Sequence, residues 1–166
     1  PELLEQLKSP AGWTREQTRR VLKERGRDAV LGPLKTWTAS VNDDHHKLEA
    51  LWLHQALRAP NESLLRTLIV HSKTPEVRAA AVRVAQHWQH DLPADEVLSL
   101  VGRCVHDENP RVRLEAVRVL GNIGSVDAIV RAMEAVDHPT DRFLDYALWL
   151  TAWETRNTWL PLVESG

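Results

Sequence analysis

The sequence predicts an all-α protein, a solenoid of about five antiparallel helix pairs, and three observations support this fold class. A segment recurs along the chain: residues 74–84 and 109–119 share Pro, Val, Arg, Ala, Val, Arg and Val at an offset of 35. Apolar residues within these segments repeat with helical spacing. Neither an Asn-Gly or Asp-Gly hairpin turn nor a sustained apolar–polar alternation indicates a β-strand.

The repeated segment divides the chain into helix pairs. Copies beginning at Arg15, Lys47, Arg78, Arg113 and Leu144 are separated by 32, 31, 35 and 31 residues. Each copy is expected to form the second (B) helix of a pair, and the apolar segment before it the first (A) helix. The expected B helices are near 13–25, 43–58, 75–89, 110–122 and 139–154. The expected A helices are near 2–8, 27–39, 61–72, 93–106 and 125–135, and a sixth begins near Asn157.

Residue types that start or stop helices mark the boundaries. Pro75, Pro110 and Pro139 are expected at the starts of B helices, where the missing N–H has no cost. The other expected markers are the N-caps Asn61, Ser125 and Asn157, the helix stops Gly26, Gly121 and Gly124, and kinks at Pro33 and Pro161.

The apolar face of the 110–122 helix shows how the pairs are expected to pack. It holds Val112, Ala116, Val119, Leu120 and Ile123. One helix pair cannot bury such a face alone, so neighbouring pairs must stack, which predicts a single repeat domain over residues 1–166. The chain begins inside an expected helix and without Met, so we expect it to be a piece of a longer protein.

The segment Asp107-x-x-Pro110-x-Val112-Arg113-x-x-Ala116-x-x-x-Leu120-Gly121 resembles the B-helix motif of HEAT repeats. The resemblance implies a HEAT-like α-solenoid, wound as a right-handed superhelix. It also implies a ladder in which Asp107, Arg113 and Arg78 tie neighbouring turns together. Ser72 occupies the equivalent Asp position one repeat earlier, so only the 107/113 pair is complete.

The segment from Asp141 to Thr151, followed by Trp159-Leu160-Pro161, also resembles part of a narrower family. This is the HEAT region of PVC-type haem-binding or membrane-bound dehydrogenase-like bacterial proteins. The resemblance implies an extracytoplasmic region that positions a cytochrome domain in a sugar-dehydrogenase-like redox protein. The redox groups of such a protein would lie outside this chain, so no cofactor is expected here.

Composition excludes several functional classes. The chain has 21 Lys and Arg against 23 Asp and Glu, which is not the basic balance of an obligate nucleic-acid binder. Its single cysteine excludes an internal disulfide. No apolar run reaches about 18 residues, so no membrane insertion is expected. The basic stretch from Arg15 to Arg27 keeps a nucleic-acid-binding scaffold as an alternative.

Candidate catalytic and metal-binding residues have simpler structural explanations. His87 and His90 share a helix face, but Asp91 is the only further ligand nearby, so we interpret them as solvated and expect no metal site. Cys104 lies on an apolar helix side with no general base on its face, which favours a buried small side chain over a nucleophile. No catalytic residue is therefore expected.

The tryptophans provide the main functional prediction. Trp52 and Trp149 occupy the repeat position that Arg83 and Arg118 hold in the sister copies, far from the apolar side of the helix. Trp153 lies one turn after Trp149. Exposed aromatic residues accompanied by arginine are typical anchors of protein interfaces, so these five residues are the predicted partner-binding set. Trp88, by contrast, is expected in the core.

The sequence therefore predicts a non-catalytic interaction or spacer scaffold that presents a curved helical surface to a partner protein or a neighbouring domain. The two alternatives are the redox-associated region and the nucleic-acid-binding scaffold, and a bilin-lyase-like HEAT protein is a weaker third. Ends without capping repeats would also expose apolar faces through which copies could associate. The sequence does not identify the cellular compartment.

Overall fold

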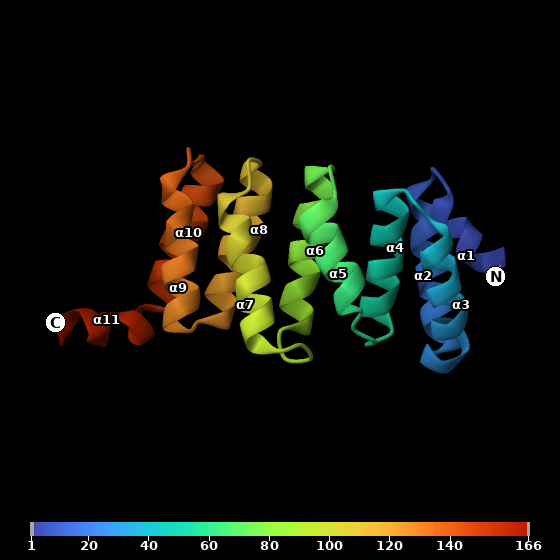
Figure 1. Ribbon diagram of the computed structural model, residues 1–166, viewed down its shortest axis with the longest axis horizontal. Coiled ribbons are helices and arrows are strands. Elements are labelled where there is room, and N and C mark those ends of the chain that lie inside the picture. The colour runs from blue at the N-terminus through green and yellow to red at the C-terminus, as the bar shows by residue number, and fades with distance from the viewer. Residues whose placement is uncertain (1, 166) are drawn as a thin grey trace. The chain divides into compact units, whose positions relative to one another are not determined.

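A computed structural model of the protein describes residues 2–165, and every regular element within this range is an α- or 3₁₀-helix (Figure 1). Helices are the expected result for a chain whose apolar residues recur at three- and four-residue spacing. The chain divides into two compact units, Pro1–Ser72 and Lys73–Gly166, and each is described by itself. No helix in the described range has the length and apolarity needed to cross a membrane.

Unit 1 contains two complete helix pairs and the A helix of a third. Its elements are α1 (Glu2–Glu5), η1 (Gln6–Lys8), α2 (Gly12–Arg25), α3 (Arg27–Ser40), α4 (Asp44–Ala56) and α5 (Glu62–His71). The B helices α2 and α4 pack against each other, and α3 contacts both of them. Trp37 of α3 is buried and donates its indole N–H to Glu5 of α1 at 2.9 Å, so neighbouring A helices are also joined.

Unit 2 contains three B helices with A helices between them. Its elements are α6 (Pro75–Trp88), α7 (Ala94–Gly102), η2 (Arg103–His106), α8 (Pro110–Ile123), α9 (Val126–Met133), η3 (Glu134–Asp137), α10 (Arg142–Glu154) and α11 (Arg156–Glu164). Figure 1 shows two layers, with α6, α8 and α10 in one and α7 and α9 in the other. Within this unit the chain is an all-α stack of antiparallel helix pairs, as predicted.

The core of unit 2 lies between these layers. Val112, Ala116, Val119 and Leu120 of α8 are fully buried, as predicted for its apolar face, and Ile123, the last predicted member, is half-buried. Trp88 is 2% exposed and belongs to the core, as expected. The main stabilisation of such a stack comes from burial of apolar surface, which contributes about 25 cal/mol per Å².

Most of the predicted helix ends are confirmed. Pro75 and Pro110 are the first residues of α6 and α8, and Asn61 and Ser125 are N-caps that accept from backbone N–H groups. Gly124 ends α8 in the left-handed region, with φ of 66°. The remaining confirmed end is Gly26, with φ of 87°.

Three predicted boundaries are wrong. Pro139 does not start a helix, because the Asp141 carboxylate accepts from the N–H groups of residues 143 and 144 and so starts α10 three residues later than predicted. Asn157 is not an N-cap, since α11 begins at Arg156 after Thr155.

Gly121 lies inside α8 and does not end it, which is the third correction. A Cβ at this position would lie 2.8 Å from the Thr151 Oγ1 atom of α10. Glycine is therefore required here for the close approach of two B helices, and not for a change of backbone direction.

Candidate interaction surface

Helix α10 exposes its large aromatic side chains on the side opposite its buried residues. Leu148 and Thr151 are buried, whereas Tyr146, Trp149 and Trp153 are 61%, 58% and 55% exposed. The rings of Trp149 and Trp153 have centroids 6.2 Å apart and planes within 6°, and Tyr146 stacks on Trp149 at 5.8 Å. We call these three residues the aromatic stripe. Its three rings form one continuous stacked surface along the helix.

Arginine side chains hold the aromatic rings at both ends of α10. The guanidinium carbon of Arg156 lies 4.5 Å from the ring centroid of Trp153, and that of Arg142 lies 4.6 Å from the ring centroid of Phe143. Phe143 is 58% exposed. Cation–π contacts of this kind attract the guanidinium to the ring face and restrict the rotation of the ring. The exposed aromatics are thus partly ordered before any partner binds.

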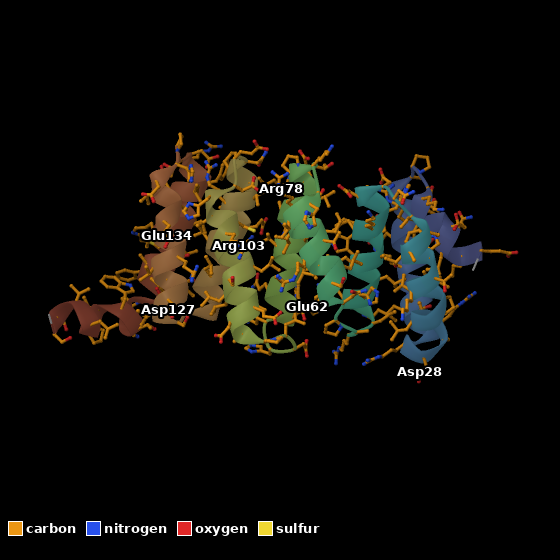
Figure 2. The ribbon with its side chains drawn as sticks, viewed as in Figure 1. Asp28, Glu62, Arg78, Arg103, Asp127 and Glu134 are labelled. Carbon is orange, nitrogen blue, oxygen red and sulfur yellow. The ribbon has the colours of Figure 1, made fainter. Side chains whose placement is uncertain are left out.

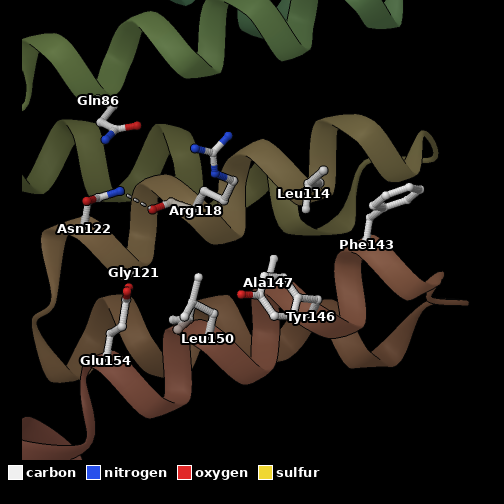
Figure 3. Close-up of a pocket in the computed structure, with 11 residues that line it drawn as sticks. Gln86, Leu114, Arg118, Gly121, Asn122, Phe143, Tyr146, Ala147, Leu150 and Glu154 are labelled. Carbon is white, nitrogen blue, oxygen red and sulfur yellow. Dashed lines mark hydrogen bonds between the residues drawn. The ribbon is translucent and has the colours of Figure 1, made fainter.

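A groove of about 450 Å³ runs between α8 and α10, beside the aromatic stripe (Figure 3). Figure 3 shows Leu114 and Arg118 projecting from α8 and Phe143 and Tyr146 projecting from α10. The other lining residues are Gln86, Gly121, Asn122, Ala147, Leu150, Thr151 and Glu154. Tyr146 belongs both to the groove and to the aromatic stripe, so the two features form one surface.

Arg83 and Arg118, both predicted for the partner surface, are joined by a buried carboxylate. Glu115 of α8 is 4% exposed, and both of its carboxylate oxygens accept from Arg83 of α6, one at 3.2 Å. The hydrogen bond that Arg83 donates to Glu115 raises the pKa of Arg83 above its usual value. Arg118 Nη1 lies 3.5 Å from the same carboxylate. The sequence reasoning missed Glu115, although a glutamate also stands at the equivalent position, Glu49, in unit 1.

Glu49 has the same role within unit 1. It is fully buried on α4, and it accepts from Arg15 at 2.9 Å and from Arg19, both of α2. The guanidinium of Arg19 also lies 5.1 Å from the Trp52 ring, which is half-buried. Trp52 therefore contacts its own unit more than the prediction assumed. Arg15 and Arg19 of the basic stretch thus bind Glu49 within unit 1.

The residues of the predicted ladder join successive repeats in unit 2. Arg78, labelled at one end of α6 in Figure 2, donates from Nε and Nη2 to the Asp107 carboxylate, both at 2.8 Å. This bond raises the pKa of Arg78. Arg113 donates to the backbone carbonyls of residues 107 and 108 and, at 2.6 Å, to that of Pro139. The Asp107 carboxylate thus binds the arginine of the preceding repeat, and Arg113 reaches forward to the next loop.

No group of three or more His, Cys, Asp or Glu side chains is arranged to hold a metal ion within the described residues. His87 and His90 are both exposed. Cys104 is buried, and its burial raises the pKa of the thiol to about 12. A thiol that stays protonated is a poor nucleophile at neutral pH.

One polar pair that the sequence did not indicate joins the 3₁₀-helical ends of two neighbouring repeats. His106 Nδ1 lies 3.3 Å from His138 Nε2, and His106 Nε2 lies 3.1 Å from the carboxylate of Glu134. Figure 2 labels Glu134 in unit 2. His106 is exposed, and Glu134 and His138 are half-buried, so the contact is a surface link between the ends of η2 and η3.

The buried His54 of unit 1 has a hydrogen-bond partner at each ring nitrogen. Its Nδ1 lies 2.9 Å from the Ala59 carbonyl, and its Nε2 lies 3.2 Å from Asn61 Nδ2. Asn61 Oδ1 accepts from the Leu64 N–H as the N-cap of α5, so the amide presents its NH₂ group to the imidazole. Desolvation of the imidazole lowers the pKa of His54.

The repeat geometry agrees with a family comparison. The model of HEAT repeats matches residues 62–149, more than half of the chain. The chain belongs to the HEAT-repeat family. HEAT repeats generally form scaffolds for protein interaction, and they expose extended binding surfaces. No curated protein and no solved structure matches the chain, so the dehydrogenase-like resemblance has no support from these comparisons.

Proposed function

We propose that this HEAT-repeat chain is a non-catalytic interaction scaffold, which binds a partner protein or a neighbouring domain through the face of unit 2 formed by α6, α8 and α10. The aromatic stripe of Tyr146, Trp149 and Trp153 is the observation that carries the proposal. Each of these side chains is more than half exposed, on the side of α10 opposite its buried residues. Stacked aromatics in water cost free energy that a partner would recover by covering them.

Two further features support this surface as the binding face. The cation–π contacts of Arg142 and Arg156 order the rings in advance, which lowers the entropy lost on association. Tryptophan, tyrosine and arginine are also the residue types enriched at the energetic centres of interfaces. The same face holds Arg118 and Arg83, the other members of the predicted set in unit 2.

The test compares the wild-type chain with a Trp149→Ala/Trp153→Ala variant and a Trp13→Ala control in the native host. Trp13 is 73% exposed in unit 1 and lies outside the proposed face. Proteins retained by each tagged chain are quantified by mass spectrometry. The leading partner is then purified, and its affinity for all three chains is measured by calorimetry.

We expect one partner whose affinity falls at least tenfold for the double variant and stays within twofold for Trp13→Ala. Loss of two interface anchors of about 1–2 kcal/mol each predicts a reduction of this size. Circular-dichroism melts check that the variants remain folded. If no retained protein distinguishes the double variant from Trp13→Ala, the proposed function is wrong.

A further inference from the structure

We propose that the groove between α8 and α10 binds a carboxylate side chain of an extended peptide segment in the partner, with Arg118 as the residue that recognises it. This inference rests on the proposed scaffold function and names the chemistry of the segment that the scaffold binds. It follows from a glutamate that stands at the same repeat position in α4 and α8 and is replaced by tyrosine in α10.

This glutamate is the third residue of the aligned segment, a position that holds Gln17 in α2 and Ala80 in α6. In α4 it is Glu49, which binds two arginines of α2, and in α8 it is Glu115, which binds Arg83 of α6. In α10 the equivalent residue is Tyr146. A B-helix arginine therefore meets a glutamate of the next B helix in each unit, and the α8–α10 step is the one where an aromatic ring takes its place.

Arg118 is the arginine left at that step. It is the repeat equivalent of Arg83, and its side chain is 55% exposed in the groove. Among the described residues, Arg118 forms an ion pair with Glu115 of its own helix, at 3.5 Å. Both oxygens of Glu115 already accept from Arg83. Two guanidinium groups thus share one carboxylate, and the Arg118 fork keeps donors for a second carboxylate.

The positive charge at Arg118 favours an acidic occupant, although the surrounding unit is acidic and Glu154 also lines the groove. Residues 73–165 hold ten Lys and Arg against fourteen Asp and Glu. The cluster of Arg83, Glu115 and Arg118 nevertheless has a net charge of +1. A carboxylate from a partner would accept charge-assisted hydrogen bonds from Arg118 in this partly enclosed site, as Glu115 accepts them from Arg83.

The shape and lining of the groove determine what accompanies the carboxylate. Leu114, Phe143 and Tyr146 form an apolar part, whereas Gln86 and Asn122 supply amide groups that can hydrogen-bond to a peptide backbone (Figure 3). A volume of about 450 Å³ is in the range of sites that take a few side chains. The expected segment therefore carries an aspartate or glutamate next to an apolar or aromatic residue.

A phage-displayed library of random heptapeptides, selected on the full chain, tests the sequence preference. The selected peptides are synthesised with a fluorophore and titrated by fluorescence anisotropy. Three chains are compared: the wild type, Arg118→Gln, and the control Arg111→Gln, which has the same substitution at an exposed position of the same helix outside the groove. Each peptide is also made with its acidic residue replaced by the matching amide, which needs no variant of the protein.

We expect enriched peptides with an acidic residue beside an apolar one. Their affinity should fall at least tenfold for Arg118→Gln and stay within twofold for Arg111→Gln. Replacing the acidic residue of the peptide by its amide should lower the affinity for the wild type by a similar factor. The same replacement should not change the affinity for Arg118→Gln. Enrichment of peptides without an acidic residue, no enrichment at all, or equal affinities for the two variants would overturn the inference.

The two proposals fail in different ways. If a partner depends on Trp149 and Trp153 while Arg118→Gln has no effect on its affinity, the carboxylate inference is wrong and the scaffold function stands. If no partner depends on the aromatic stripe, the scaffold function is wrong, and with it the inference that depends on it.

Discussion

Replacing Gly121 by alanine tests whether the close approach of α8 and α10 sets the geometry of the groove. The new Cβ would lie 2.8 Å from Thr151 Oγ1 and 3.1 Å from Thr151 Cγ2. Thr151 is buried and β-branched, so its side chain has few alternative rotamers in the helix. We expect the two helices to move apart by a few tenths of an ångström and the protein to lose stability.

The magnitude follows from two opposing effects. Alanine in place of glycine inside a helix stabilises it by about 1 kcal/mol. Overpacking of a tight core contact costs about 1–3 kcal/mol. Gly121→Ala should therefore lower the free energy of unfolding by up to about 2 kcal/mol, whereas the same change in a Thr151→Ala background should raise it by up to about 1 kcal/mol, since the clashing atoms are absent.

The assay is urea unfolding of the four chains of this double-mutant cycle. It should give a coupling free energy of about 1–3 kcal/mol between positions 121 and 151. Gly12→Ala is the control, because a Cβ there meets only Arg15 Nη2 at 3.8 Å. Gly12 is the first residue of α2, where the gain in helix propensity is smaller than in the interior, so its effect should stay within about 0.5 kcal/mol. If Gly121→Ala stabilises the protein equally in both backgrounds, the close approach does not require glycine.

Three further outcomes are expected. Burial lowers the pKa of His54, whereas in the unfolded chain the imidazole has its ordinary pKa of 6.5, so the unfolded state binds protons more readily. The stability of the folded protein should therefore fall as the pH drops below about 6.5. His54→Gln should remove part of this pH dependence in thermal melts between about pH 5 and 8. The Cys104 thiol, with a pKa of about 12, should resist a disulfide reagent at pH 8 until urea unfolds the chain, and rapid modification of the folded protein would contradict its burial. Asp107→Asn should cost about 1–3 kcal/mol by weakening the partly buried pair with Arg78, whereas the exposed Glu24→Gln should cost less than about 0.5 kcal/mol in the same assay.

Local patterns in the sequence predicted most of the fold. The repeated segment identified the B helices, and the three- and four-residue spacing of apolar residues identified the buried face of α8. Pro75 and Pro110 marked helix starts correctly. Pro139 and Gly121 did not have their predicted roles, because an aspartate N-cap and a contact with another helix, respectively, decide those positions.

The candidate site was predictable only where one helix defines it. The spacing of Trp149 and Trp153 placed both on the side of α10 away from the core, since helical periodicity alone fixes that direction. The role proposed for Arg118 depends on Glu115 of its own helix and also on Tyr146 of α10. The sequence by itself therefore determined the helices, their faces and the repeat period, because these follow from residues three or four positions apart. Only the tertiary structure decided which charged side chains meet between helices, because small differences in how neighbouring helices pack determine which of the residues on facing sides come within hydrogen-bonding distance.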